Sequence, residues 1–489
     1  MSEKFSIIGD FKDFFDNNMS GETFDEKTFA DFLTENFITV PKKDHVSFIM
    51  DALKEFYDKN LKADELDVKS FMNFMEPKFT AAGYRQGFNP NPTERKKGNI
   101  LILTEVGLGD LIISTGAIRE IRRIYFEAHI TLVAHRDSFI FAKLCPYVDE
   151  VISTDNYNSI DEKFIDQFPN IYELCMKTAS KLLARRFDVC FSFSTRAYTD
   201  LLMYMSGARI RLASIYYKTL AKLDATKNTH RLLRQVKLLA TQPVPYGDSH
   251  CHMADRFFSL VEEILHVPIL NRKLEVWCTA KDISAAKEIL KNVSNPFYAL
   301  SMGGTLARKH YPPEKYARLL EMIAAEEPSA HFVILGGGNE DLKSAEIIKA
   351  TSPDLYDKRT TDLTNKLTYR QSAAVLSFCK MLIANDTGTG HIAAGLGCPV
   401  LSPNCFSANF KMSNNDTPPR WIPYGVPCVV VLPEHALPEC QDEPHSIYGC
   451  RLEDTPHCIT QIEPETLLKG FHLLKERASK KINEPIYIH

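Results

Sequence analysis

Two short segments of this chain combine glycines with polar side chains in a pattern that suits the binding of an anion. The first is the turn Gly107-Leu-Gly-Asp110, which follows the apolar run 99–104. The second is Asp386-Thr-Gly-Thr-Gly-His391, which follows the apolar run 381–384. Each pattern predicts a buried strand, a tight turn and a helix. Because main-chain N–H groups at a helix N-terminus have no partner in the helix, each turn can receive a phosphate or a developing negative charge.

The second segment is the more specific of the two. It places a carboxylate (Asp386), two hydroxyls, two glycines and an imidazole within six residues. The helix amides and the two threonines, Thr387 and Thr389, can hold a departing phosphate, and His391 can add a hydrogen-bond donor. A single histidine is more often structural than functional. In this company we expect His391 to face a ligand.

The first segment supports two interpretations. Gly107 and Gly109 are needed by any tight strand-to-helix turn, so the pair alone is a weak signal. The Asp110 carboxylate suits a helix cap, where it would accept hydrogen bonds from main-chain N–H groups. It equally suits a general base that deprotonates a hydroxyl. Local sequence favours the cap.

Two further turns carry polar side chains beside glycines. In Ser301-Met-Gly-Gly-Thr305, the amides and Thr305 suit a diphosphate whose charge Lys309 would neutralise. A surface loop ending at a proline explains this stretch equally well. In Leu335-Gly-Gly-Gly-Asn-Glu-Asp341, Glu340 or its neighbour could bind ribose hydroxyls, as in dinucleotide folds, although a plain turn is almost as consistent.

The elements that must position these turns follow an alternating pattern. Short apolar runs separated by helical stretches predict strands covered by helices on both faces, so the fold class is α/β with parallel sheets. We expect strands at 99–104, 129–134, 149–152, 187–193, 297–302, 331–335, 381–384 and 399–402. The domain boundaries expected from this pattern are an acidic helical extension and linker over 1–95, a first Rossmann-like domain over 96–275 and a second over 276–489.

Composition limits the function classes. The chain has 489 residues, 44% of them hydrophobic, and a net charge of −4, which argues against bulk nucleic-acid binding. No N-terminal signal peptide and no apolar run of about 18 residues is recognisable, so a cytoplasmic protein is expected. The twelve cysteines are then most simply reduced thiols.

Charge is unevenly distributed along the chain. Residues 1–80 carry ten Lys and Arg against seventeen Asp and Glu, together with thirteen phenylalanines, which favours a packed helical bundle over disorder. Residues 181–240 carry twelve Lys and Arg against three Asp. This excess indicates either an anionic partner or a solvated helical face.

Several motifs in this order resemble glycosyltransferase family 9, the ADP-heptose:lipopolysaccharide heptosyltransferases. The resemblance extends over residues 97–475, and Tyr311 replaces a tryptophan that is usual in the family. The motifs that carry it are the Gly-Asp turn with Arg119-Glu-Ile-Arg-Arg, Pro146-Tyr-Val-Asp-Glu-Val-Ile152, His252-Met-Ala-Asp-Arg-Phe-Phe-Ser-Leu, Lys309-His-Tyr-Pro, Asp362-Leu-Thr-Asn-Lys-Leu-Thr and Asp386-Thr-Gly-Thr-Gly-His-Ile-Ala-Ala.

The resemblance implies a GT-B architecture, in which two Rossmann-like domains face a cleft. It implies an inverting, metal-independent transfer of a sugar from a nucleotide-sugar, with ADP-heptose as the expected donor. The expected acceptor is a phosphorylated, anionic glycolipid of the lipopolysaccharide core, met at the cytoplasmic face of the inner membrane. It makes Asp110 the catalytic base, which reverses the local preference for a cap. It places the donor on Thr305, Lys309, Glu340, Asp386, Thr387, Gly388 and His391.

Two regions extend beyond the family pattern. Residues 1–80 are a candidate oligomerisation or docking module, or a packed extension. The tail carries Cys428, Cys440, Cys450 and Cys458, four thiols that could hold a structural zinc or iron ion. Their spacing lacks a Cys-x-x-Cys pair, so free thiols are the stronger expectation.

Alternative functions remain open at this point. The acceptor could be a protein, as in the heptosyltransferases that modify autotransporters. A GT-B nucleotide-sugar epimerase is a second enzymatic class, and a scaffold subunit that binds a nucleotide-sugar without turnover is a non-enzymatic one. A dinucleotide oxidoreductase is least favoured, because no complete Gly-x-Gly-x-x-Gly follows the first strand.

Overall fold

The apolar runs of the first half of the chain pair into a six-stranded sheet with the order β3-β2-β1-β4-β5-β6. In the central pairings β1 lies parallel to both β2 and β4, with Ile100 opposite Ile130 and Val189. This is the strand order of a Rossmann sheet. The strands are β1 (Asn99–Thr104), β2 (His129–His135), β3 (Glu150–Thr154), β4 (Val189–Phe193), β5 (Ile210–Tyr216) and β6 (Gln242–Tyr246).

The second half of the chain repeats this order in a seven-stranded sheet, β13-β12-β11-β10-β7-β8-β9. Here β7 lies between β8 and β10, both parallel to it. The α/β class and the two parallel Rossmann-like sheets expected from the sequence are therefore confirmed. The strands are β7 (Phe297–Ser301), β8 (His331–Leu335), β9 (Thr360–Asp362), β10 (Met381–Ala384), β11 (Val400–Pro403), β12 (Cys428–Val431) and β13 (Ile486–Ile488).

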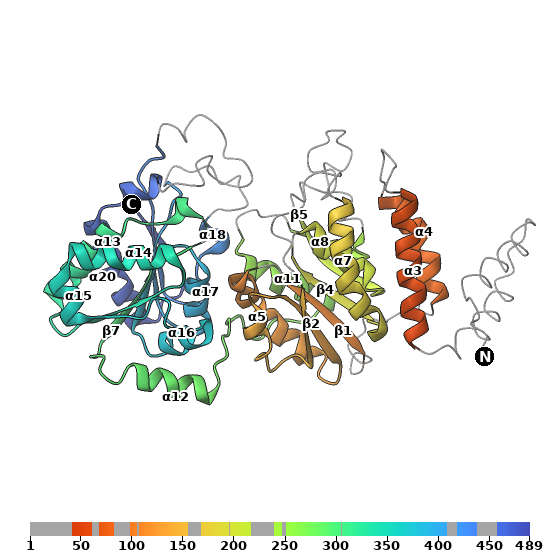
Figure 1. Cartoon of the computed structure of the whole chain (residues 1–489), viewed down its shortest axis with the longest axis horizontal. Helices are drawn as coiled ribbons and strands as arrows, with labels where there is room; N and C mark the ends of the chain where they lie inside the picture. Colours follow the sequence, from red (N-terminus) through yellow and green to blue (C-terminus); the bar gives the residue numbers. More distant parts are fainter. Residues whose placement is uncertain are drawn as a thin grey trace, which may run out of the picture. The chain divides into compact units, whose positions relative to one another are not determined.

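Helices connect the strands, as the alternating pattern requires, and are drawn in Figure 1. In the second sheet, α20 packs against α13, β11 and β12, and its Phe471 and Leu474 are fully buried. The longer helices are α3 (Lys42–Asn60), α4 (Val68–Ala81), α5 (Leu108–Ile124), α7 (Phe168–Leu182), α8 (Ala197–Met205), α11 (Met253–Leu265), α12 (Ala280–Ile289), α13 (Pro313–Glu326), α14 (Asn339–Thr351), α15 (Pro353–Arg359), α16 (Tyr369–Leu376), α17 (Gly388–Gly395) and α20 (Pro464–Lys480). Shorter elements are α6 (Phe139–Ala142), α18 (Pro418–Trp421), η2 (Leu183–Arg185), η4 (Ala307–Lys309) and η5 (Cys458–Gln461).

The structure is a computed structural model that describes residues 42–60, 68–82, 98–104, 107–154, 168–194, 196–216, 239–246, 251–304, 306–407, 418–437 and 457–489. The chain divides into two compact units. The first comprises Met1–Glu105, Ile124–Val133 and Val148–Pro245, and the second comprises Val106–Arg123, Ala134–Tyr147 and Tyr246–His489. The first turns of α5 and α17, which carry the two anion-binding motifs, thus belong to the same unit. Among the described helices, none has the length and apolar character that crossing a bilayer demands.

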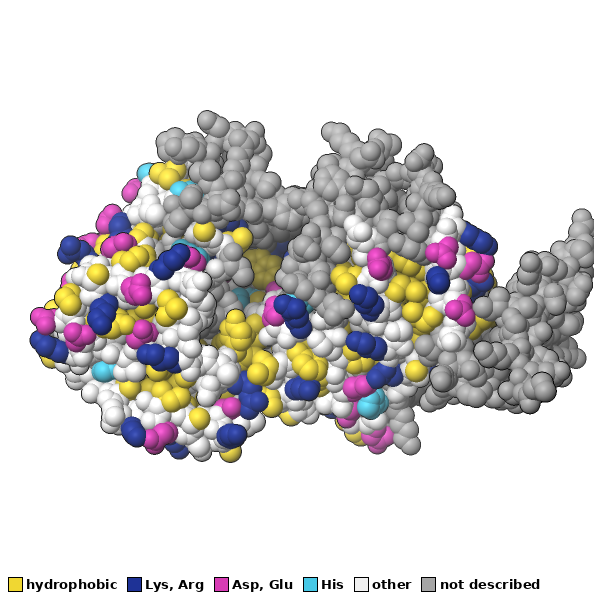
Figure 2. All heavy atoms as spheres, viewed as in Figure 1, with side chains coloured by type: hydrophobic (Ala, Val, Ile, Leu, Met, Phe, Trp, Pro, Cys, Tyr) yellow, Lys and Arg dark blue, Asp and Glu magenta, His cyan; other side chains and the backbone are white. Residues whose placement is uncertain are grey.

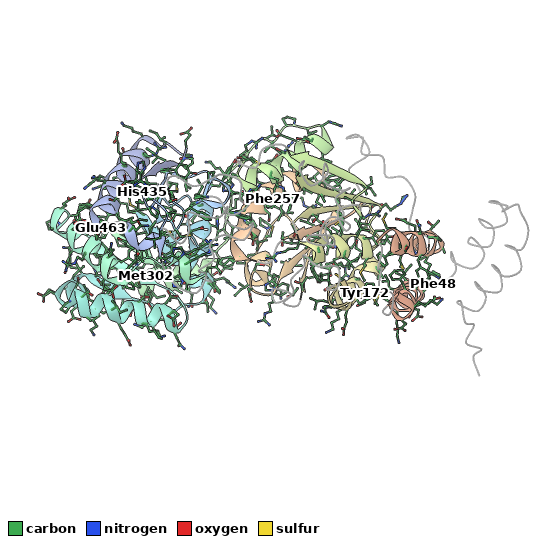
Figure 3. All side chains as sticks on the ribbon, turned by 90° about the horizontal axis from the view of Figure 1, so that it is seen from above. Phe48, Tyr172, Phe257, Met302, His435 and Glu463 are labelled. Carbon is green, nitrogen blue, oxygen red and sulfur yellow. The ribbon has the colours of Figure 1, made fainter. Side chains whose placement is uncertain are left out.

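The acidic N-terminal region contributes α3 and α4 to the core of the first unit. Phe71 of α4 contacts the rings of Tyr172 and Tyr204, with ring centroids 6.2 and 5.2 Å away. The Tyr172 hydroxyl donates to the main-chain oxygen of Leu53 in α3, and Tyr172 is labelled beside Phe48 of α3 in Figure 3. The apolar faces of α3 and α4 are therefore used within the chain. Residues 1–41 lie outside the described residues.

Replacing Phe71 with alanine tests whether α3 and α4 are structural parts of the first unit. Phe71 is fully buried, so Phe71→Ala should lower the free energy of unfolding of this unit by about 3–5 kcal/mol. Urea titration followed by circular dichroism would measure the loss. The matched control is Lys59→Ala in α3, an exposed side chain whose removal should change stability by less than about 0.5 kcal/mol. Equal stabilities for the two variants would show that the helix pair folds separately.

Candidate functional site

The candidate site lies where the order of the second sheet reverses, at the carboxyl ends of β7 and β10. Ligands of open α/β sheets bind at such a switch point, because the loops after the two strands leave in opposite directions. The turn after β7 begins at Met302, labelled in Figure 3, and the turn after β10 begins at Asn385. The Ser301 hydroxyl donates to Thr389 Oγ1 across the two turns at 3.2 Å. The predicted phosphate-binding segments therefore meet.

Asn385 holds the two turns together, although sequence reasoning gave it no role. Its side-chain N–H donates to the main-chain oxygen of Met302. Its side-chain oxygen accepts from the Tyr316 hydroxyl at 2.7 Å and from the main-chain N–H of Tyr311 at 3.3 Å. Asn385 is almost completely buried, so these bonds are protected from water. Its partners lie about 70 to 80 positions earlier in the chain, which is why no local pattern marked it.

Lys309 and Asp386 form an ion pair, with Nζ and Oδ2 2.7 Å apart. Their side chains are 22% and 14% exposed. Burial alone would raise the pKa of the Asp386 carboxyl, but the Lys309 ammonium and more distant positive charge hold it below its usual range. Burial alone would likewise lower the pKa of Lys309, and Asp386 holds it above its usual range. Both groups are therefore charged at neutral pH, and each compensates the other.

Arg308 adds a buried positive charge beside this pair. It is 1% exposed and donates to Cys405 Sγ at 3.2 Å. Burial raises the pKa of the Cys405 thiol to about 11, despite Arg308 and Lys309. Cys405 is thus a neutral thiol at pH 7. The sequence did not predict that Arg308 is buried at the site, because arginine in a turn is ordinarily exposed.

The N-terminus of α17 presents polar atoms that lack protein partners in the described part of the chain. Thr387 precedes the helix, and its buried hydroxyl caps no helix amide and meets no other partner there. The same holds for the buried Nδ1 atom of His391, whose residue is 7% exposed. A buried polar atom without a partner costs free energy, so such atoms point to a ligand. Gly388 is the first residue of α17.

His391 is neutral at physiological pH. Burial lowers its pKa to about 4, against the pull of the Asp386 carboxylate. Its ring lies against the first turn of α5, since a Cβ atom built on Gly109 would come within 2.6 Å of His391 Cδ2. Position 109 must therefore be glycine for the two helix N-termini to approach this closely. The two motifs that opened the sequence analysis lie side by side in the second unit.

Asp110 occupies the third position of α5, and its carboxylate accepts a hydrogen bond from the main-chain N–H of Gly107 at 2.9 Å. This is half of a capping box, so the cap interpretation of Asp110 describes a real contact. A Cβ atom on Gly107 would lie 2.5 Å from Asp110 Oδ2, so this bond also depends on glycine. The contact fixes the orientation of the carboxylate and is compatible with its use as a base.

Two neighbouring acidic residues after β8, Glu340 and Asp341, have different environments. Glu340 is exposed and pairs with Lys343 at 2.6 Å, which lowers the pKa of Glu340. Figure 2 shows acidic and basic side chains interspersed on the surface over α13, α14 and α15. Asp341 is instead buried against Gly303 and Gly336 and accepts from the Gly337 N–H at 2.8 Å. Burial raises the pKa of Asp341, although the Gly337 N–H opposes this. The ribose role expected for Glu340 stays a prediction.

Some of the other predicted site residues lie outside the described residues. Thr305 lies outside them, as do Cys440 and Cys450 of the cysteine tail. Cys428 packs with Ile422 and Val430 in an apolar cluster, and burial raises its pKa to about 12, which opposes the thiolate form that a metal requires. The described residues contain no group of three or more His, Cys, Asp or Glu placed to hold a metal ion. The zinc or iron site expected in the tail thus receives no support.

In the described part of the basic stretch 181–240, two arginines make contacts within the fold. Arg185 pairs with Glu150, and the guanidinium of Arg211 donates to the main-chain oxygen atoms of Leu239 and Ala208. These contacts favour the interpretation of a structural role for both residues. Residues 217–238, which carry six of the twelve basic residues of the stretch, lie outside the described part.

Comparison with known proteins shows similarity to one family of enzymes. Residues 181–403 match the model of glycosyltransferase family 9 (heptosyltransferase). Lipooligosaccharide heptosyltransferase 2 of Haemophilus influenzae is 27% identical over 94 residues, which is 19% of this chain and 26% of that protein. Lipopolysaccharide heptosyltransferase 3 of Escherichia coli is 20% identical over 304 residues, which is 60% of this chain and 78% of that protein.

Solved structures show the same fold. The family 9 glycosyl transferase of Veillonella parvula superposes with a TM-score of 0.55 at 16% identity, covering 78% of this chain and 97% of that one. ADP-heptose lps heptosyltransferase II of E. coli gives a TM-score of 0.53 at 17% identity, covering 78% of this chain and 99% of that one. Over residues 181–403 this chain therefore resembles glycosyltransferase family 9 (heptosyltransferase), and its two Rossmann-like sheets agree with the fold of these solved structures.

Proposed function

We propose that this protein transfers a heptose from ADP-heptose to a hydroxyl of a lipopolysaccharide-core glycolipid, with inversion at the anomeric carbon. The names of the relatives, which are lipooligosaccharide and lipopolysaccharide heptosyltransferases, support this choice of donor and acceptor. The single observation that carries the proposal is the meeting of two helix N-termini, where Asp110 of α5 and the unpartnered polar atoms of Thr387 and His391 occur together.

The diphosphate of the donor suits the N-terminus of α17. Its amides and the positive end of the helix dipole attract an anion. The Thr387 hydroxyl and the neutral His391 ring can each donate a hydrogen bond to a phosphate oxygen, which would supply their missing partners. Arg308 adds a buried positive charge beside the Lys309–Asp386 pair. This positive environment can stabilise the leaving diphosphate, so the transfer is proposed to need no metal ion.

The transfer then follows from the roles of these groups. Asp110 removes the proton from the acceptor hydroxyl as that oxygen attacks the anomeric carbon. The bond between the anomeric carbon and the phosphate oxygen breaks, and its electron pair stays on the departing diphosphate. The bond from the Gly107 N–H holds the Asp110 carboxylate in place, so the base is oriented before the acceptor binds. We propose that Glu340 contacts the ribose.

The proposed reaction also implies where the protein acts. A protein that uses a nucleotide-sugar and a glycolipid would act in the cytoplasm, in peripheral contact with the inner membrane. An anionic acceptor would be attracted by the basic residues of 217–238.

Replacing Asp110 with asparagine distinguishes its proposed role as a base from its role as a helix cap. The asparagine side-chain oxygen can still accept from the Gly107 N–H, but the amide cannot take a proton. We expect Asp110→Asn to lower the rate of transfer by about 10³-fold while the affinity for ADP stays within about two-fold. The assay is ADP release from ADP-heptose with and without deacylated lipopolysaccharide core, and the control is Asp137→Asn. Full activity in Asp110→Asn would leave Asp110 with the cap alone.

Removing the Lys309 ammonium tests the donor site. We expect Lys309→Ala to weaken ADP binding by about 10- to 100-fold, because a charge-assisted contact is lost and Asp386 is left to repel the diphosphate. Calorimetric titration would measure ADP beside UDP and GDP, with exposed Lys358→Ala as the control. In the double variant Lys309→Ala/Asp386→Asn the repulsion is absent. Binding that remains weak there supports a direct contact, whereas full recovery would mean that Lys309 serves only to neutralise Asp386.

The low pKa of His391 predicts how stability depends on pH. Between about pH 6.5 and pH 4 the unfolded chain binds a proton at this histidine and the folded chain does not, so stability falls as the pH falls. At pH 5 this contribution is about 2 kcal/mol relative to pH 7.5. His391→Gln lacks it, so the stability difference between variant and wild type should shift by that amount between the two pH values. Urea unfolding measures it, and parallel pH profiles would contradict a buried neutral His391.

A further inference from the structure

Two cysteines of the second unit lie within reach of each other. The sulfur atoms of Cys379 and Cys398 are 3.3 Å apart. Cys379 lies in the turn between α16 and β10, and Cys398 lies in the turn between α17 and β11. Because Leu382 of β10 is paired with Val400 of β11 in parallel, both cysteines sit just before the amino-terminal ends of neighbouring strands.

The segment between these cysteines contains the whole donor motif. It runs through β10, the turn Asp386–Thr387 and α17, and its ends are 19 positions apart in the sequence. The motif follows the carboxyl end of β10, whereas the cysteines precede its amino end. A bond between the two sulfur atoms would thus close a loop around the donor motif without forming at the phosphate-binding turn.

The two thiols differ in their accessibility. Cys379 is half-buried, and its neighbours Phe378 and Lys380 are exposed. Cys398 is 5% exposed. Contact with Cys379 and burial together raise the pKa of the Cys398 thiol well above its usual range. A small reagent would therefore meet Cys379 first, and Cys398 is placed to react second.

We propose that Cys379 and Cys398 are a redox modification site that forms a reversible disulfide by exchange with a low-molecular-weight disulfide such as oxidised glutathione. The Cys379 sulfur attacks one sulfur of the reagent, giving a mixed disulfide and releasing one small thiol, which takes the Cys379 proton. The Cys398 sulfur then attacks the Cys379 sulfur, and the second small thiol leaves with the Cys398 proton. Two protein thiols are oxidised and one small disulfide is reduced to two thiols.

The two sulfur atoms would need to move only a short distance to form a disulfide bond. A disulfide bond is about 2.0 Å long, so the sulfur atoms must approach by roughly 1.3 Å, which side-chain rotation can supply. In the reducing cytoplasm the pair would rest as thiols, and oxidation would be transient. The bond would join the turns that lead into β10 and β11 and so restrict unfolding of the segment that carries the donor motif.

The test uses the full-length protein incubated with oxidised glutathione and digested with trypsin without reduction. We expect the peptide 371–380, which contains Cys379, to be linked to the peptide 381–411. The latter contains both Cys398 and Cys405, so the matched control is Cys405→Ser, in which the link must persist. It should disappear in Cys398→Ser and in Cys379→Ser, and reductant should reverse it in the wild type. Because Cys379 lies in a partly exposed turn, Cys379→Ser gives a folded reference if Cys398→Ser misfolds.

Two further readouts follow from the position of the bond. Oxidation should raise the melting temperature of the wild type by roughly 5 °C and leave that of Cys379→Ser unchanged. The affinity for ADP should stay within about two-fold, because the bond forms at the opposite ends of the strands from Asp386. Absence of the linked peptide, its persistence in Cys398→Ser, or glutathione retained on Cys379 would each overturn the proposal. None of these outcomes depends on whether the protein transfers heptose.

Discussion

The site depends on how closely the first turn of α5 approaches the first turn of α17. That approach is possible only because position 109 has no side chain, since a Cβ atom there would lie 2.6 Å from the ring of His391. The same turn needs a second glycine at position 107, where a Cβ atom would displace the Asp110 carboxylate. Glycine at both positions thus lets Asp110, the proposed base, lie near the N-terminus of α17, the proposed phosphate site.

The sheet determines where this meeting occurs. The reversal of strand order between β7 and β10 separates the two loops that follow them, and Asn385 joins these loops again through bonds to Met302, Tyr311 and Tyr316. With Asn385 in place, the Ser301 hydroxyl reaches Thr389 and Lys309 reaches Asp386. The carboxyl ends of β7 and β10 therefore determine where the two turns lie. The buried side chain of Asn385 fixes the turns relative to each other, as a rigid anion site requires.

Local patterns predicted the strands because buried parallel strands are continuous apolar runs, and β1, β8 and β10 begin and end where those runs do. They also predicted the turns, because glycine beside a hydroxyl or carboxylate has few other uses at a strand end. They could not predict contacts between distant positions. Lys309 was expected to face a diphosphate, and its pairing with Asp386, 77 positions later, was not anticipated. From the sequence, the cap role and the base role of Asp110 appeared as alternatives. The hydrogen bond from the Gly107 N–H to Asp110 is compatible with both roles.

The charge balance of the site is consistent with a proposed diphosphate site that uses main-chain amides and a neutral histidine. Lys309 and Asp386 compensate each other, and His391 carries no charge at pH 7 because its pKa is about 4. Arg308 and the dipoles of α5 and α17 add positive potential near the turn. A stronger fixed charge would bind the product diphosphate as tightly as the transition state and slow its release. In the proposed transfer, positive groups combined with oriented amides would stabilise the negative charge that develops as the anomeric bond breaks, and would still allow the trianionic ADP to leave.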